Sequence, residues 1–463
     1  MGDVNNTRGV FASRLGFLLV AAGCAVGLGN VWRFPFITGQ CGGAIFVLIY
    51  IVFLFLLGIP ILTVELAIGR SSGCSVVKAF TSISPNFRRW GVIPVISMFG
   101  LYMLMSYYSV IAGWLVYYFV QVAEGSTIGL SKTEIGAKFN SLQADPYIQL
   151  AYVFMVIATV CFICYRGLQN GVEKITKYCM VGMFLVMIVM AANSLTLEGA
   201  SAGMSFYLKP DLEAVEKVGW FNVILNAMTQ VFFSLSVGIG SILIFGSYIS
   251  KKHSLIKESS IIAILDTIVA LLAGVIIFPA CYTYGIKPDV GPTLVFQTMI
   301  QMFSQMPNGR IWGSVFFLFL SIAALTTVVA VIEGIIAGCM ELFNWSRHKS
   351  AMVNFVVIPL LSVPVILGFN QWSGFTPLGS GSNILDLCDF IVTNNVLPIG
   401  ALLMVMFCVS KTGWGWNGYV NEVNSGSGIK LLGAEFERSY YKYFVVSIII
   451  VLLLTGYYGK FFA

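Results

Sequence analysis

LGFLLVAAGCAVGLGNVWRFPF, at residues 15–36, is the stretch of sequence that decides the fold. It begins as a membrane helix, because no charged residue occurs in it before Arg33. Three glycines then interrupt it, and each lowers helix stability by roughly 1 kcal/mol relative to alanine. Those glycines are Gly23, Gly27 and Gly29. A helix broken inside a bilayer frees backbone N–H and C=O groups, which is tolerated only where they line a cavity or bind a ligand.

The glycines by themselves are also typical of a helix-packing face, where small residues let two helices approach closely. Asn30 and Arg33 distinguish the two interpretations, because lipid cannot solvate either side chain at this depth. The pattern therefore favours a ligand site in the middle of the first span.

The composition is that of a polytopic membrane protein. Of the 463 residues, 58% are hydrophobic and 10% are charged, and the mean hydropathy is +0.89. A hydrocarbon core of about 30 Å requires roughly 17–25 apolar residues per helix. Eleven runs reach that length, at residues 15–37, 43–69, 91–122, 149–167, 175–196, 223–249, 259–286, 310–342, 351–369, 384–410 and 440–459. The first apolar run lacks a small-residue cleavage site, so we expect no cleaved signal peptide.

Positive charges predict the orientation of the chain. Most of the 26 Lys and Arg residues lie in the segments that face the cytoplasm if the N-terminus is inside. Because cytoplasmic loops carry an excess of Lys and Arg, we expect that orientation. An odd number of spans then leaves the C-terminus outside.

The sixth span carries a second interruption. Residues 230–241 read QVFFSLSVGIGS, in which serines and glycines punctuate an apolar run five spans after the first break. Paired interrupted spans in corresponding halves are typical of transporters built from inverted repeats. We therefore predict an N-terminal repeat over residues 1–196 (spans 1–5) and an inverted C-terminal repeat over residues 197–410 (spans 6–10). Residues 411–463 then form a cytoplasmic loop and the eleventh span.

Four acidic residues lie inside predicted spans, where each costs roughly 2.5–3.5 kcal/mol to insert at the helix centre. We expect each to face the interior of the bundle beside a partner. They are Glu65, Asp266, Glu333 and Asp389. The only two histidines, at 253 and 348, fall in predicted cytoplasmic loops, which argues against a zinc site or a histidine-based nucleophile within the membrane.

Thr326 and Thr327 stand side by side in the eighth span. Threonines in membrane helices often donate to a carbonyl of their own helix, and that is one interpretation. The other is a cation site, because a hard ion such as Na⁺ binds hydroxyls, carboxylates and free backbone carbonyls. The residues alone leave both interpretations open.

Several motifs together resemble those of the neurotransmitter:sodium symporter family. They are GCAVGLGNVWRFP at 23–35, the glycine pair at 42–43, GIPILTVELAIGR at 58–70, FFSLSVGIGS at 232–241 and ALTT at 324–327. The resemblance covers spans one to ten in order and fits best the bacterial amino-acid transporter branch, the eleven-span type similar to the bacterial leucine transporter. It implies an all-α polytopic membrane protein of two inverted five-helix repeats, with broken helices 1 and 6 and one extra C-terminal helix.

The resemblance also implies two sites for Na⁺, the ion that such proteins carry with their substrate. The first site is expected to consist of the Ala25 carbonyl, Asn30, Ser234 and Asp266 together with the substrate carboxylate. The second is expected to consist of the carbonyls of Gly23, Val26 and Ala323 and the hydroxyls of Thr326 and Thr327.

The implied substrate site lies between the two breaks. The substrate carboxylate is expected at the amides of Leu28 and Gly29 and the hydroxyl of Tyr108, which places an anion at the positive end of a half-helix. The amine is expected at the carbonyls of Ala25 and Phe233 and at Ser236. The residues expected around the substrate side chain are Leu104, Tyr108, Phe233, Ile239, Thr327 and Val331.

The resemblance implies a gate on each side of this site. Outside, Arg33 and Asp389 are expected to pair over the substrate, with Gln230 and Phe233 beneath them. Inside, Arg8 and Glu341 are the expected closing pair, near Ser247, Tyr248 and Glu333. Two positions depart from the family. Phe11 replaces a tryptophan at the inner gate, and Val181 replaces a proline linked to local unwinding of span five.

These observations predict a sodium-coupled symporter, not an enzyme, in a bacterial inner (cell) membrane. We expect it to import neutral, hydrophobic or aromatic L-amino acids by alternating access. Gly27 occupies the position of the amine-binding aspartate of monoamine transporters, which leaves room for a substrate that brings its own carboxylate. The alternatives are a channel and an intramembrane enzyme that uses an Asp266/Asp389 pair.

Two further differences concern chloride. Asp266 replaces the more common asparagine, and Ala270 replaces a serine that binds the anion in chloride-dependent members of the family. If a nearby Na⁺ keeps the Asp266 carboxylate ionised, it supplies the negative charge that chloride supplies elsewhere, and we expect chloride-independent transport. The alternative is a protonated Asp266 that is hydrogen-bonded within its own helix. The expected partners are an amino acid, sodium ions and the lipid bilayer, with no nucleic acid, and a homodimer is compatible with the resemblance.

Overall fold

The computed structural model describes residues 10–84, 87–286 and 292–461. Within these ranges the regular structure is helical, and the one isolated extended pairing joins His253 to Ser427. Nine of the described helices are long and apolar enough to cross a membrane, or up to eleven if each of two bent helix pairs counts as one span. The predicted all-α polytopic fold is confirmed.

Each predicted apolar run contains at least one helix, and the first and sixth are interrupted. Span one consists of α1 (Arg14–Ala25), a π-helical segment (Gly29–Arg33) and α2 (Phe34–Gln40). Span two is α3 (Ala44–Phe53) and α4 (Ile59–Ser72), and spans three to five are α7 (Val92–Glu124), α9 (Pro146–Tyr165) and α10 (Lys174–Leu195). Span six is α13 (Trp220–Leu235) and α14 (Leu243–Gly246). Spans seven to eleven are α15 (Leu255–Thr283), α17 (Gly309–Phe343), α18 (Arg347–Leu367), α19 with α20 (Ile384–Ile391, Leu397–Val409) and α23 (Val446–Phe461).

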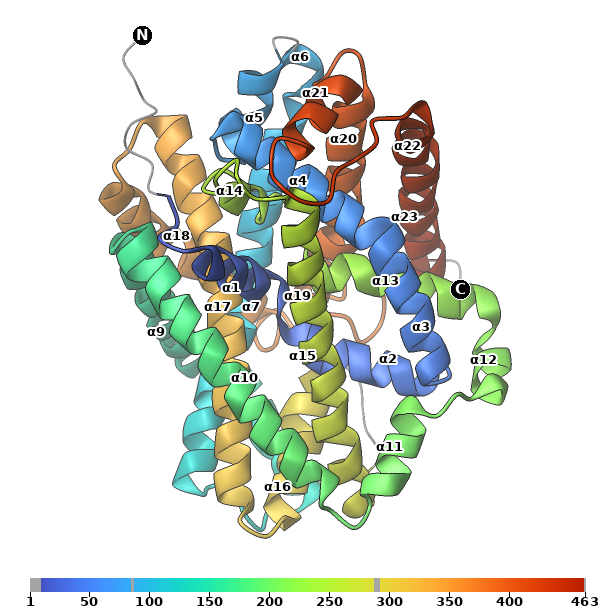
Figure 1. The fold of residues 1–463 in the computed structure, drawn as a ribbon. Coiled ribbons are helices and arrows are strands. Elements are labelled where there is room, and N and C mark those ends of the chain that lie inside the picture. The colour runs from blue at the N-terminus through green and yellow to red at the C-terminus, as the bar shows by residue number, and fades with distance from the viewer. Residues whose placement is uncertain (1–9, 85–86, 287–291, 462–463) are drawn as a thin grey trace.

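Shorter helices gather at the two ends of the bundle (Figure 1). We call one end the inner end, because the sequence predicts that it faces the cytoplasm. It holds α5 (Val76–Ile83), α6 (Phe87–Trp90), α14, α21 (Trp416–Val423) and α22 (Glu435–Ser439). The outer end holds α8 (Lys132–Ala144), α11 (Ala200–Leu208), α12 (Leu212–Val218) and α16 (Met299–Gln305). α17 runs through the bundle centre, and every residue from 326 to 339 is buried.

Local sequence explains the break in span one. The Ser13 side chain accepts a hydrogen bond from the Gly16 amide at 3.0 Å and caps the start of α1. The helix ends at Ala25, because Val26 is extended with ψ 105°. The axis then bends by 59° before the helical segment that begins at Gly29. The break therefore lies among the glycines that predict it.

The second break also lies where the sequence predicts it, but the inner half of span six is shorter than expected. α13 ends at Leu235, and Ser236 adopts a left-handed conformation with φ 50°, followed by Gly238 at 98° and Gly240 at 84°. Positive φ angles suit glycine and interrupt a helix. Only the single turn of α14 follows, so the predicted run to residue 249 is not one continuous helix. A further 91° bend at Gly219, between α12 and α13, was not predicted.

The unwound stretch of span six lies directly against span ten. A Cβ on Gly238 would fall 1.9 Å from the carbonyl oxygen of Leu397, and a Cβ on Gly400 would fall 1.9 Å from the carbonyl oxygen of Gly238. Neither position has room for a side chain, so the two backbones touch. The Gly238 amide donates a hydrogen bond to the buried carboxylate of Glu65 in span two. Glu65 thus has the interior partner that its position in a span predicts.

Candidate functional site

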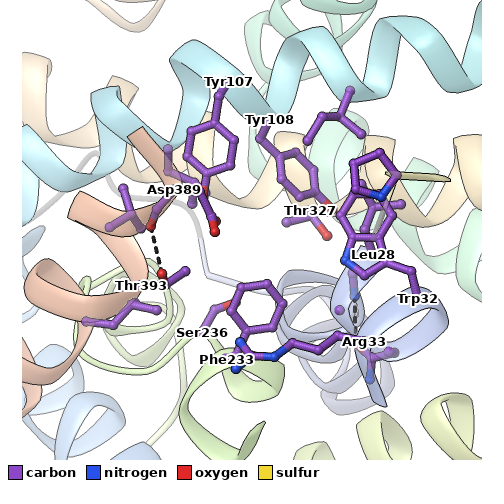
Figure 2. Close-up of a pocket in the computed structure, with 18 of the residues that line it drawn as sticks. Leu28, Trp32, Arg33, Tyr107, Tyr108, Phe233, Ser236, Thr327, Asp389 and Thr393 are labelled. Atoms are coloured by element: carbon purple, nitrogen blue, oxygen red, sulfur yellow. Dashed lines mark hydrogen bonds between the residues drawn. The ribbon is translucent and has the colours of Figure 1, made fainter. Parts of the chain in front are cut away.

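A cavity of about 450 Å³ opens between the breaks of spans one and six (Figure 2). Its walls come from spans one, three, six, eight and ten. The predicted substrate-site residues in these walls are Ala25, Leu28, Gly29, Leu104, Tyr108, Phe233, Ser236, Ile239 and Thr327. Val331 is buried one helical turn beyond Thr327 and is not part of the wall. The structure therefore brings the predicted set together, with that one exception.

Three of the residues predicted for the first sodium site form one buried polar cluster. The Asn30 amide nitrogen lies 2.8 Å from Asp266 Oδ1, 3.0 Å from the Asp266 carbonyl and 3.3 Å from the Ser234 hydroxyl. The Ser234 hydroxyl also donates to Asp266 Oδ2. All three side chains are at most 1% exposed. A carboxylate, a hydroxyl and an amide so close together supply the hard oxygen ligands that an alkali cation prefers.

Thr327 connects the break of span one to span eight. Its hydroxyl lies 3.2 Å from the Gly23 carbonyl, 3.0 Å from the Val26 carbonyl and 3.2 Å from the Ala323 carbonyl. The neighbouring Thr326 hydroxyl donates to Ala323 at 2.9 Å. Both threonines therefore donate to a carbonyl of their own helix, as the first interpretation expects. The oxygens predicted for the second sodium site also lie close to one another, around the Thr327 hydroxyl.

The described residues offer no competing site for a transition metal. No group of three or more His, Cys, Asp or Glu side chains gathers among them. The two oxygen clusters are therefore the candidate ion sites, and the cavity lies between them.

Gly27 and Gly29 shape the wall of the cavity. A Cβ on Gly27 would lie 3.2 Å from the Tyr108 hydroxyl and 3.6 Å from that of Thr327. A Cβ on Gly29 would lie 2.3 Å from the Phe233 ring. These positions keep the Tyr108 hydroxyl and the Phe233 ring close to the start of the outer half-helix. The first amides of a helix have no partner within it, so this start is a natural place for an anion.

The predicted outer gate pair lines the cavity without closing it. The Arg33 guanidinium lies over the Phe233 ring, 4.8 Å from its centroid, whereas Asp389 accepts a hydrogen bond from Tyr107 at 3.0 Å (Figure 2). Arg33 and Asp389 do not meet as an ion pair within the described ranges. Gln230, predicted beneath them, is fully buried outside the cavity wall, and its side-chain amide has no hydrogen-bond partner among the described residues.

At the inner end, Glu333 and Tyr248, both expected near the inner gate, form a buried cluster with Arg347, which the sequence did not single out. Arg347 Nη1 and Nη2 each lie 2.7 Å from a carboxylate oxygen of Glu333, and Tyr248 donates to the same carboxylate at 3.0 Å. In the sequence, Arg347 is one of the positive charges of a predicted cytoplasmic segment. No local pattern identifies it, because its contact with Glu333 depends on how α18 packs on α17.

The predicted Arg8–Glu341 pair cannot be placed, because Arg8 lies outside the described residues. Glu341 accepts hydrogen bonds from the amide and the hydroxyl of Ser75, at the start of α5. Phe11 packs against Phe17, Phe245 and Tyr248, with ring centroids 5.7–6.2 Å apart. The phenylalanine at the position where the resemblance implies a tryptophan thus packs against three aromatic rings.

Glu173 was also missed, and it holds the inner end of span one. It lies in the π-helical segment Leu168–Glu173 that begins span five and is 4% exposed. Its carboxylate accepts hydrogen bonds from the Ala12 amide at 2.7 Å, the Ser13 amide at 3.0 Å and the Ser13 hydroxyl at 2.9 Å. A negative charge there stabilises the positive end of α1. Sequence carries no signal for this contact, since the partners lie about 160 residues apart.

A second ionic contact holds the same end of α1. Arg14 Nε lies 2.8 Å from Glu258 at the start of α15, and the Glu258 side chain is 2% exposed. Moving the inner half of span one away from the bundle would break this contact as well as those of Glu173.

Comparison with known proteins gives consistent matches. The family described as the sodium:neurotransmitter symporter family matches residues 8–141 and 126–458. The sodium-dependent transporter YhdH of Bacillus subtilis is 34% identical over 401 residues, 87% of each chain. A sodium-dependent transporter of Haemophilus influenzae is 34% identical over 417 residues, 87% of this chain and 89% of the other. The crystal structure of MhsT in complex with L-phenylalanine superposes with a TM-score of 0.85 at 34% identity, covering 97% of this chain and all of the other.

The Glu173 contact gives a prediction for hydrogen exchange. Glu173→Gln removes the charge that faces the amide end of α1, an effect of about 1–2 kcal/mol in a part-buried site. We expect amides of α1 to exchange roughly 5- to 30-fold faster in this variant, measured by hydrogen–deuterium exchange mass spectrometry.

The matched control is Glu437→Gln. Glu437 also accepts hydrogen bonds from backbone amides at the inner end, those of Leu432 and Gly433, but it does not contact α1. The Glu437→Gln variant should therefore leave hydrogen exchange in α1 unchanged. Equal exchange of α1 in wild type and Glu173→Gln would show that the carboxylate does not hold this helix.

Proposed function

The chain belongs to the sodium:neurotransmitter symporter family, and we propose that it carries hydrophobic or aromatic L-amino acids into the cell together with Na⁺. Family membership makes it a multi-pass, sodium-dependent membrane transporter and not an enzyme. One observation carries the finer proposal: a single cavity lies between a buried carboxylate cluster and a cluster of hydroxyl and carbonyl oxygens.

The lining of the cavity supports the proposed substrate class. Leu104, Ile111, Phe233 and Ile239 give it apolar walls, so a charged substrate side chain would lose its hydration without gaining a partner. The cavity has room for an aromatic ring, and MhsT, which shares 34% of its sequence with this chain, was crystallised with L-phenylalanine.

The polar groups would bind the backbone of the amino acid. Its carboxylate would lie at the amides of Leu28 and Gly29 and the Tyr108 hydroxyl, and its amine at Ser236 and the carbonyls of Ala25 and Phe233. One Na⁺ would bind Asn30, Ser234 and Asp266 beside that carboxylate. A second would bind Thr326 and Thr327 with the carbonyls of Gly23, Val26 and Ala323. Filling the first site then favours substrate binding by direct charge attraction.

Alternating access agrees with the difference between the two ends of the bundle, since among the residues that the structure describes oppositely charged side chains pair at the inner end and not at the outer end. Arg33 and Asp389 are separated, while Glu333, Arg347 and the Glu173 contact close the inner end. In the proposed cycle, substrate draws Arg33 toward Asp389, and release into the cytoplasm follows when the contacts of α1 open. The two predicted repeats, residues 1–196 and 197–410, would move relative to each other. A channel would not need such complementary gates.

The proposed orientation places the N-terminus in the cytoplasm and the C-terminus outside, in a bacterial cell membrane. The positive charges of the sequence support this orientation, and both bacterial relatives support the setting.

We further propose that transport does not require chloride. Asp266 receives hydrogen bonds from Asn30 and Ser234, so its carboxylate lies within the proposed first sodium site. A fixed negative charge there would balance Na⁺ without a dissolved anion. Ala270, one turn along α15, offers no hydroxyl to bind one.

Uptake by purified protein in proteoliposomes tests the proposal as a whole. With an inward Na⁺ gradient, labelled L-phenylalanine should accumulate saturably and unmodified, and replacing Na⁺ by K⁺ should abolish uptake. Other hydrophobic and aromatic L-amino acids should compete. Glutamate and lysine should compete poorly, and so should tyramine, which has no carboxylate for the half-helix or the first Na⁺. Strong competition by tyramine, or uptake without Na⁺, would contradict this assignment.

Chloride gives a separate prediction. Replacing chloride by gluconate on both sides should leave wild-type uptake unchanged, because Asp266 supplies the compensating charge. Asp266→Asn should be strongly impaired in chloride-free buffer. Loss of wild-type uptake in gluconate would overturn this role of Asp266.

The second sodium site predicts the effect of Thr326→Val. Valine keeps the shape of the side chain but removes the hydroxyl, so the Na⁺ concentration needed for half-maximal phenylalanine binding should rise roughly tenfold, the effect of about 1.4 kcal/mol. A scintillation proximity assay measures it. Thr38→Val is the matched control, since Thr38 is equally buried and back-bonded, to Phe34 at 2.8 Å, but lies outside both sites. An unchanged midpoint in Thr326→Val would exclude this ligand.

A further inference from the structure

A second cavity, of about 520 Å³, lies at the inner end on the outside of the bundle, away from the substrate site. It is bordered by the end of α9, the start of α10 and the start of α18. The residues that define it are Tyr165, Arg166, Asn170, Lys174, Tyr178 and His348. We call it the basic pocket. None of the residues that line it is acidic, so Arg166 and Lys174 give it a net positive charge.

These positive charges are available for a ligand. The side chains of Arg166, Lys174 and His348 are exposed, and neither Arg166 nor Lys174 belongs to an ion pair within the part of the chain that the structure describes. The nearest buried acid in sequence, Glu173, is directed at the amides of α1 instead. The pocket therefore has cationic donors without a protein anion to neutralise them.

Aromatic side chains form the sides of the pocket. Tyr165 stacks on the His348 ring, with centroids 4.1 Å apart and planes 28° apart. Tyr165 is 42% exposed and Tyr178 is 69% exposed. Arg166 lies 5.6 Å from the centroid of the Phe162 ring. Tyrosine and arginine have an apolar stem or ring and a polar tip. Both are therefore typical of the boundary between lipid headgroups and acyl chains.

An apolar stripe leads away from the pocket along α10. Lys174, Tyr178, Val181 and Leu185 follow one another at helical spacing and so lie on one face of α10. Val181 and Leu185 are 44% and 61% exposed. On α9, the 59% exposed Phe162 lies one turn before Arg166. α9 and the start of α10 lie at the edge of the bundle (Figure 1). Exposed apolar side chains at the edge of a membrane-spanning bundle face the acyl chains of the bilayer.

We propose that the basic pocket binds the phosphate headgroup of an anionic phospholipid, whose acyl chains lie along the exposed stripe of α10. Positive charges without acidic neighbours select a negative headgroup, and the adjoining apolar stripe selects a lipid over a soluble phosphate. The pocket includes Asn170 and Lys174, which lie on either side of Glu173 in the sequence. A lipid in the pocket would therefore contact the ends of spans four, five and nine, next to the carboxylate that holds the start of α1.

Native mass spectrometry of protein released from nanodiscs tests the proposal. The nanodiscs contain phosphatidylcholine with or without phosphatidylglycerol, and the bound lipids are counted. Wild type should retain phosphatidylglycerol in preference to phosphatidylcholine. Arg166→Gln/Lys174→Gln should lower the apparent affinity for phosphatidylglycerol roughly twenty- to thirty-fold, since each charge near a membrane surface contributes a factor of about five.

The matched control is Lys252→Gln/Lys257→Gln, which removes the same charge from exposed positions at the inner end but outside the pocket. It should retain phosphatidylglycerol as wild type does. Each variant is first checked for wild-type affinity for L-phenylalanine, and Lys174→Gln alone, with roughly a fivefold loss, replaces the double variant if that one fails to fold.

Two results would overturn the proposal. Equal retention of phosphatidylglycerol by wild type and the pocket variant would show that the pocket is not the binding site. Added inorganic phosphate that raises the melting temperature of wild type as much as phosphatidylglycerol does would show that the site takes a free anion and not a lipid.

Discussion

The need to satisfy backbone groups freed inside a membrane constrains the whole structure. Two spans are broken midway along the bundle, where lipid offers no partner to the freed carbonyls and amides. The protein supplies partners from other spans: the Glu65 carboxylate takes the Gly238 amide, and the Thr327 hydroxyl lies between the carbonyls of Gly23 and Val26. Thr327 also belongs to the proposed second sodium site, so there one hydroxyl both satisfies the broken backbone and is a proposed ion ligand.

The two ends of the bundle differ in the kind of contact that closes them. At the outer end, the charged side chains of Arg33 and Asp389 line an open cavity and interact with aromatic neighbours. At the inner end, a buried carboxylate is paired with a half-buried guanidinium, as in Glu333 with Arg347. A buried pair costs several kcal/mol to desolvate, so it adds little net stability, yet breaking it by removing one partner is costly. Such contacts suit a gate, because their energy depends strongly on whether water reaches them.

The sequence predicts what depends on local chemistry. Glycines with Asn30 and Arg33 in an apolar run locate the first break, serines and glycines at 234–240 locate the second, and hydropathy locates the spans. All but one of the substrate-site residues that the resemblance implies lie in the cavity wall. Arg347 and Glu173 could not be predicted, because charged residues near span ends look like ordinary surface charges until the packing of distant helices brings Glu333 or the start of α1 against them. Val331 is implied by the resemblance alone, which does not fix how far along α17 the cavity extends, and it lies buried outside the wall.

The backbone contact between Gly238 and Gly400 has a consequence for how the binding site can evolve. Span six is fixed there by Glu65 on one side and by the main chain of span ten on the other, with no side chain between them. The adjacent Ile239 therefore projects into the cavity from a main chain that cannot retreat. Exchanging that one side chain for a larger or smaller one would change the shape of the cavity without moving the main chain that carries it. In a lineage with this architecture, a point substitution at this position would change which substrate fits, while the cluster of Asn30, Ser234 and Asp266 keeps its place.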